Sequence, residues 1–104
     1  MPAGNSAKYY AGLCYLRLGD FDNAIAYLED FDGEGELLPI MKYGLLGDCY
    51  SEKKEYDKAL DNYKKATTAG ENDVLVSYYL KKLGMLNEYQ GNKDAAKEAY
   101  ERLH

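Results

Sequence analysis

The 104-residue sequence has few of the side chains from which catalytic and metal sites are built. It contains one histidine, His104, two cysteines and no tryptophan. An ordinary zinc site needs about four Cys, His or carboxylate ligands in a set, and no such set is present. Gly33-Glu34-Gly35 alone is too short a signal for a phosphate-binding loop. We therefore expect no metal and no cofactor, and we expect the protein not to be an enzyme, which is kept only as a remote alternative.

Long apolar runs and an excess of positive charge are also missing. No apolar run approaches the roughly 20 residues that span a bilayer, so we expect no membrane insertion by this segment. The 13 basic and 18 acidic residues give a formal charge of −5, and the lysines alternate with acids along the chain. Nucleic-acid binding requires a positive footprint. Nucleic acid is therefore not an expected partner.

Three similar segments cover most of the sequence. Each segment has a glycine, an alanine twelve residues later and a large residue four after that, and the glycines recur at intervals of 35 and 37 residues. The members are Gly12, Ala24 and Leu28; Gly47, Ala59 and Tyr63; and Gly84, Ala96 and Tyr100. Repeats with a period of 20 to 50 residues indicate stacked arrays.

The segments Ala11-Gly12-x-x-Tyr15, Leu46-Gly47-x-x-Tyr50 and Leu83-Gly84-x-x-Asn87, with the alanines that follow, resemble the signature of the tetratricopeptide repeat family. Its period is about 34 residues. The resemblance implies an all-α fold: a right-handed α-solenoid of three helical hairpins with six antiparallel helices. It also implies one domain, 1–104, with repeats of about 5–36, 37–72 and 73–104. Of the aromatics that usually open the first helix only Tyr43 is present, and no repeat closes on proline.

Turn residues predict where the helices end. Gly19-Asp20 and Gly91-Asn92 combine a glycine that can adopt a left-handed conformation with a residue that can cap the next helix. Lys54-Glu55 takes the equivalent place with weaker signals. The expected helices are 6–18, 21–31, 38–53, 56–69, 73–90 and 93–103.

Small residues and tyrosines form the expected core. Glycine inside a helix costs about 1 kcal/mol relative to alanine, so Gly12, Gly47 and Gly84 require close helix approach, for which the repeat alanines would supply the small partners. Cys14 and Cys49 occupy equivalent places, and we expect both to be buried, reduced and without a disulfide. Equivalent positions in stacked hairpins lie about 8 to 10 Å apart, too far for a disulfide.

The resemblance places the first helix of each hairpin on a concave face. The candidate partner-binding residues are the side chains of these helices left over after the core is assigned: Tyr9, Leu13, Arg17, Met41, Gly44, Asp48, Ser51, Tyr78, Lys81, Lys82, Met85 and Glu88. Tyrosine, methionine and arginine are enriched at protein interfaces. We expect Gly44 to let a partner's backbone come close. An alternative for each of these side chains is packing between hairpins.

The carboxylate clamp by which some family members hold a chaperone tail is missing. At the matching places stand Tyr9, Leu13, Leu45 and Tyr78, and only Lys82 keeps the expected charge. The resemblance therefore implies another protein or peptide as the partner.

Two functions are predicted from different classes. The first is a protein–protein interaction scaffold that binds a peptide or protein segment in the concave groove. The alternative is a structural module that self-associates, as a homo-oligomer through its open ends, where Leu86, Ala99, Tyr100 and Leu103 would form an apolar stripe. Weak similarity to bacterial envelope or secretion-associated repeat proteins suggests a fragment of a longer, anchored chain facing the periplasm; a complete chain would be cytoplasmic.

Overall fold

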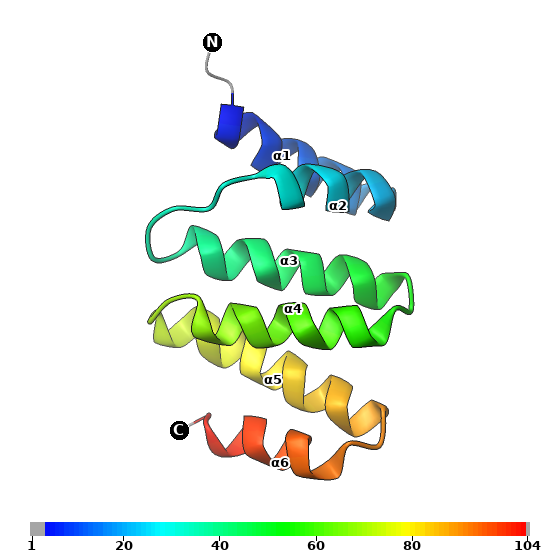
Figure 1. Cartoon of the computed structure of the whole chain (residues 1–104), viewed down its shortest axis with the longest axis vertical. Coiled ribbons are helices and arrows are strands. Elements are labelled where there is room, and N and C mark those ends of the chain that lie inside the picture. The colour runs from blue at the N-terminus through cyan, green and yellow to red at the C-terminus, as the bar shows by residue number, and fades with distance from the viewer. Residues whose placement is uncertain (1–3, 104) are drawn as a thin grey trace.

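The computed structural model describes residues 4–103, and over that range it consists of six α-helices without strands. The helices are α1 (Gly4–Arg17), α2 (Phe21–Asp30), α3 (Leu38–Glu52), α4 (Tyr56–Thr68), α5 (Asp73–Tyr89) and α6 (Lys93–Glu101). They stack in chain order from one end of the molecule to the other (Figure 1). The described chain is therefore an α-solenoid of three helical hairpins, as predicted. His104 lies outside the described residues.

The turn glycines within the hairpins agree with the prediction, but Asn92, unlike Asp20, makes no side-chain cap hydrogen bond. Gly19 and Gly91 adopt φ values of 80° and 81°, the left-handed region that closes a helix. Lys54 takes the same conformation with a φ of 63°, although it is not a glycine. The Asp20 side chain then accepts a hydrogen bond from the Asn23 backbone N–H and so caps α2. These short turns make the two helices of each hairpin antiparallel neighbours.

Close approach explains the glycines within the helices, but the partners differ from those expected. A Cβ atom added to Gly47 would lie 2.5 Å from the Tyr63 ring, and one added to Gly84 would lie 2.5 Å from the Tyr100 ring. At Gly12 the nearest side chain is that of Leu28, at 2.8 Å. The large residue of each repeat, rather than its alanine, thus packs on the glycine.

The core consists of two buried clusters that meet at α3. One contains Ala24, Leu28 and Cys49, and the other contains Tyr63 and Tyr79 with their neighbours. Tyr43 and Tyr50 pack against both clusters. Because the first cluster joins α2 to α3 and the second joins α3 and α4 to α5 and α6, each hairpin is buried by its neighbours.

The prediction that both cysteines are buried is wrong for Cys14. Cys49 is fully buried against α2, whereas Cys14 is exposed, and both are free thiols. The physical reason is position in the stack, since no helix precedes α1 within the described residues.

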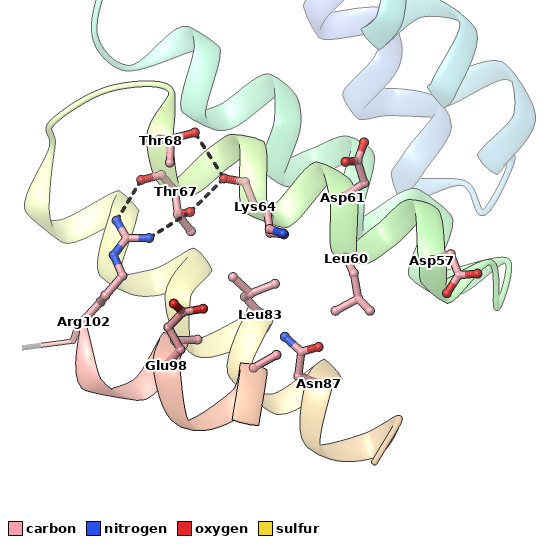
Figure 2. A pocket seen from close by; sticks show the side chains of 12 residues that line it. Asp57, Leu60, Asp61, Lys64, Thr67, Thr68, Leu83, Asn87, Glu98 and Arg102 are labelled. Atoms are coloured by element: carbon pink, nitrogen blue, oxygen red, sulfur yellow. Dashed lines mark hydrogen bonds between the residues drawn. The ribbon is translucent and has the colours of Figure 1, made fainter. Parts of the chain in front are cut away.

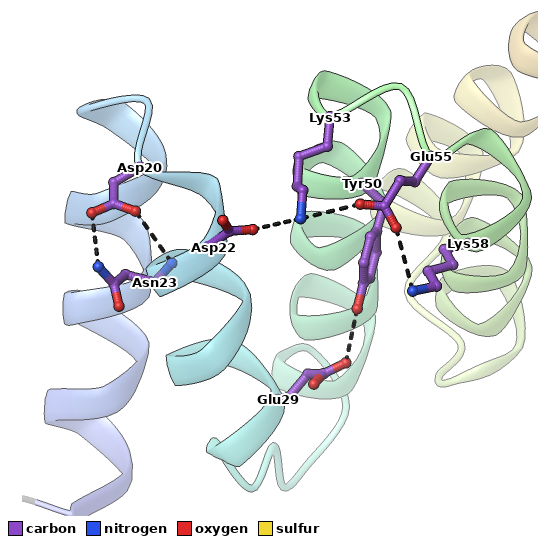
Figure 3. Close-up of polar contacts among 8 residues, drawn as sticks. All are labelled: Asp20, Asp22, Asn23, Glu29, Tyr50, Lys53, Glu55 and Lys58. Atoms are coloured by element: carbon purple, nitrogen blue, oxygen red, sulfur yellow. Dashed lines mark hydrogen bonds and ion pairs between the residues drawn. The ribbon is translucent and has the colours of Figure 1, made fainter.

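Polar contacts also join the first hairpin to the second (Figure 3). The Lys53 ammonium lies 2.5 Å from Asp22 of α2 and 3.1 Å from Glu55, which also pairs with Lys58. The Tyr50 hydroxyl donates to Glu29 of α2 at 3.1 Å. Exposed pairs of this kind contribute little individually, so they orient the hairpins while the core stabilises them.

Candidate functional site

The first helices of the last two hairpins, α3 and α5, contact each other and line a groove. One hollow of about 400 Å³ lies over Asp48, Ser51 and Lys82, with Leu16 of α1 at its edge. A second hollow of about 310 Å³ shares Ser51, Tyr63 and Lys82 and extends to Met85 and Tyr89. We call this surface the α3–α5 groove and define it by these two sets of residues.

An ion pair forms the centre of the α3–α5 groove. The Lys82 ammonium donates to Asp48 Oδ1 at 2.8 Å, and the Tyr63 hydroxyl donates to the same oxygen at 2.6 Å. The Lys82 nitrogen also lies 4.8 Å from the centre of the Tyr78 ring, a distance at which a cation is attracted to an aromatic face. The centre of the groove is therefore polar but internally neutralised.

Burial and charge act in opposite directions on the pKa of Lys82. Burial alone would lower this pKa, because the charged form loses water. The hydrogen bond and the negative charge of Asp48 outweigh burial, so the pKa is raised. Burial raises the pKa of Tyr63, and Asp48 raises it further. At neutral pH the groove therefore holds a charged lysine and a neutral phenol.

Exposed apolar side chains follow one face of α5. Tyr78, Met85 and Tyr89 are 51%, 59% and 72% exposed. Their spacing of seven and four residues keeps them on one side of a helix with 3.6 residues per turn. Tyr89 also meets Tyr56 of α4 edge to face at 5.5 Å. This row gives the groove an apolar border.

The candidate residues on α1 lie apart from the hollows. Tyr9 is half-buried, its ring is 5.3 Å from that of Phe31, and its hydroxyl donates to the Met41 sulfur at 4.0 Å. Leu13 is half-buried and Arg17 is exposed. These three residues of the first hairpin therefore lie outside both hollows of the groove, whereas Leu16 lines the first of them.

Two predicted groove residues serve other purposes. Gly44 is buried, and a Cβ atom added there would overlap the Tyr79 ring, so no partner backbone can approach it. Glu88 accepts a hydrogen bond from the Tyr100 hydroxyl at 2.7 Å and lines a hollow with residues of α6. Of the other predicted residues on these two helices, Asp48, Ser51, Lys82 and Met85 line the groove, and Tyr78 and Lys81 are exposed on α5.

Two groove residues come from α4, a helix on which the sequence analysis predicted no partner-binding residue. Tyr56 and Tyr63 both line the groove. Tyr63 reaches it because Gly47 leaves room for its ring, and its hydroxyl needs a partner when buried, which Asp48 supplies. The signal was the glycine and the tyrosine of the same repeat taken together.

Among residues 4–103 no group of His, Cys, Asp and Glu side chains is arranged to hold a metal ion. In the same part of the chain, no helix combines the length and the apolar character needed to cross a membrane.

Comparison with known proteins identifies the repeat. One family model described as tetratricopeptide repeat matches residues 6–31 and 80–104, and a second with the same description matches residues 43–73. Searches of curated proteins and of solved structures found no match. Tetratricopeptide repeats generally mediate protein–protein interaction, and proteins built from them are typically non-catalytic scaffolds. The chain belongs to the tetratricopeptide repeat family.

Proposed function

We propose that the chain is a protein–protein interaction scaffold that binds a segment of another protein in the α3–α5 groove. The observation that carries this proposal is the row of Tyr78, Met85 and Tyr89, three large side chains that α5 leaves more than half exposed beside a hollow. Apolar side chains exposed in this way mark interaction sites. Methionine also adapts its shape to different partners.

The charges of the groove favour a particular kind of segment. Asp48 and Lys82 neutralise each other, so the centre suits the uncharged peptide backbone and polar side chains of a ligand. Lys81 and Glu52 are exposed at the borders, where charges set orientation and association rate more than affinity. The ligand is therefore an extended segment with apolar anchors that lie along α5, and binding is proposed without catalysis.

The experiment is selection of random peptides on the wild-type protein, followed by titration of the selected peptides against variants. Met85→Glu places a charge in the apolar row and should weaken binding by about 1 to 2 kcal/mol. Lys64→Ala, on α4 and outside the two hollows of the groove, is the control and should leave the affinity of a groove-binding peptide unchanged. If the selected peptides bind Met85→Glu as tightly as the wild type, the groove is not the site.

The second candidate function is self-association through the first hairpin. Tyr10, Cys14 and Leu18 follow one another at intervals of four residues and are exposed, with Leu18 at 79%. At the corresponding place in the second hairpin, Cys49 is covered by α2. The apolar stripe expected at the last hairpin is largely absent, because Leu86 and Ala99 are buried. Sedimentation at rising concentration should show dimers that Leu18→Glu abolishes, and a strict monomer would exclude this candidate.

A further inference from the structure

A separate hollow lies on the other side of α5 from the α3–α5 groove. This cleft of about 470 Å³ has α4 and α6 as its walls and α5 as its floor (Figure 2). Leu83 and Asn87 line its floor, whereas Met85 and Tyr89 line the groove. At 100° per residue these two pairs point to different sides of the helix. The α4–α6 cleft, as we call it, is therefore a separate site, within the 300 to 1,000 Å³ typical of ligand pockets.

The cleft exists because one aromatic ring is missing from the repeat pattern. Asn87 follows Gly84 by three residues, as Tyr50 follows Gly47. The Tyr50 ring packs against both core clusters, its hydroxyl donates to Glu29 of α2, and Lys58 of α4 lies 5.5 Å from the ring centre. Figure 3 shows the ring between Glu29 and Lys58. In the third repeat an asparagine takes the place of this ring.

The Asn87 side chain offers a hydrogen-bond donor at the base of the cleft. It is 6% exposed, and its oxygen accepts from the Asn92 amide at 3.2 Å. Within residues 4–103 its own amide nitrogen donates to no acceptor, and in Figure 2 this nitrogen lies on the side of Leu83. No buried side-chain nitrogen or oxygen of the described residues lacks a hydrogen-bond partner, so this nitrogen is open to the cleft, where it can donate to an entering acceptor. An oxygen atom at the tip of an incoming side chain would supply one.

The walls and the rim add apolar contact and charge. Leu60, Leu83 and Ala99 give the cleft apolar surface. On the rim, Arg102 is held by hydrogen bonds to the side chain and backbone oxygens of Thr67. Asp57, Glu98 and Lys64 also line the cleft and, like Arg102, form no ion pair with any other described residue. The rim therefore carries two negative and two positive unpaired charges and favours neither sign, so apolar contact and the Asn87 amide select the ligand.

We propose that the α4–α6 cleft binds a tyrosine side chain presented by a partner polypeptide. The ring takes the space that Tyr50 fills in the second repeat and contacts Leu60, Leu83 and Ala99. The phenol oxygen accepts from the Asn87 amide. Because this site and the groove face different sides of α5, one chain holds two partner segments, or two parts of one partner, independently.

The test titrates three capped tripeptides, Gly-Tyr-Gly, Gly-Phe-Gly and Gly-Leu-Gly, into the isotopically labelled protein and follows amide and methyl resonances. We expect Gly-Tyr-Gly to shift the Asn87 side-chain amide and the Ala95 and Ala99 methyl signals. Gly-Leu-Gly should bind at least about tenfold more weakly because it lacks the aromatic contact, and Gly-Phe-Gly about threefold to tenfold more weakly because it lacks the oxygen that accepts from Asn87.

Variants separate this cleft from the groove. Asn87→Tyr restores the missing ring and should abolish binding while the melting temperature stays at or above that of the wild type. Ala95→Phe fills the cleft from an exposed position on α6 and should also abolish binding, which keeps the test valid if Asn87→Tyr misfolds. Met85→Glu should leave binding unchanged. Equal binding of Gly-Leu-Gly, full binding by Ala95→Phe, or loss of binding in Met85→Glu would overturn the proposal.

Discussion

The first and second hairpins carry the same residue at the same repeat position, yet the two residues lie in different environments. Cys49 of α3 is buried against Ala24 and Leu28 of α2, and Cys14 of α1 is exposed. The backbone around both is helical, so local structure does not explain the difference. Neighbouring hairpins do, because a repeat buries its core only where another repeat packs on it.

The second and third hairpins differ in the same way. Tyr63 is buried between Gly47 and Tyr79, whereas Tyr100, which packs on Gly84 in the same manner, is only half-buried. The Tyr100 hydroxyl donates to the exposed Glu88, whereas the Tyr63 hydroxyl donates to Asp48 in the groove. Place in the stack thus decides whether an equivalent residue stabilises the array, lines a groove or faces solvent.

The largest expected effect is on the free energy of unfolding of Tyr63→Ala compared with Tyr100→Ala. Removing a buried aromatic ring costs about 3 to 5 kcal/mol, and we expect this loss for Tyr63. No helix that follows α6 covers Tyr100 within residues 4–103. Tyr100→Ala should therefore cost about 1 to 2 kcal/mol, because less buried apolar area is lost. Urea unfolding of both variants measures the difference. Equal losses would show that the two hairpins do not differ as their burial indicates.

The two cysteines should differ in their rates of reaction with a thiol reagent at neutral pH. Burial, with the nearby charges of Asp48 and Glu52, raises the pKa of Cys49 to about 12, and the thiolate is the reactive form. Cys14 should be labelled at least about 100-fold faster than Cys49, since the ratio reflects both access and thiolate fraction. Labelling of Cys14→Ser and Cys49→Ala separates the two rates, and similar rates would place Cys49 outside the core.

A smaller effect tests the hydroxyl of Tyr63. Tyr63→Phe keeps the ring and removes one hydrogen bond to Asp48, so stability should fall by about 0.5 to 1.5 kcal/mol. The Lys82 and Asp48 pair stays in place, and peptide affinity should change little. Tyr100→Phe is the matched control and should be almost neutral because its partner Glu88 is exposed. A larger loss in the control would contradict the distinction between the hairpins.

The smallest expected effect is a pH dependence of stability that comes from the ion pairs of the first two hairpins. Hydrogen bonds from Lys53 and Lys58 lower the pKa of Glu55 below 4.5, and Lys8 lowers that of Asp30 below 3.8. A lowered pKa means that the folded state favours the ionised form, so this stability is present above those values and is lost as pH falls through the folded-state values. Thermal melts from pH 6 to pH 2 should show it, and Glu55→Gln should remove part of the change. An unchanged slope in that variant would show that Glu55 makes no contribution.

The sequence predicted the helices and their turns closely because the signals there are local. At Gly19-Asp20 and Gly91-Asn92, the residue that ends one helix and the residue that precedes the next are adjacent in the sequence. Gly44 was misinterpreted because its neighbour, the Tyr79 ring, lies 35 residues away in the sequence and no local pattern links the two. The groove was predicted only in part, since Tyr56 and Tyr63 reach it from α4 across the hairpin. Packing between elements, rather than propensity, decided these positions.

Native-state hydrogen exchange of the backbone amides tests most directly the central claim that place in the stack decides stability. Amides of α3 and α4 should exchange most slowly, near the rate set by global unfolding, because both flanking hairpins bury this pair. Amides of α1 and α6 should exchange faster. Protection that is uniform along the chain, or greatest in α1, would contradict the claim.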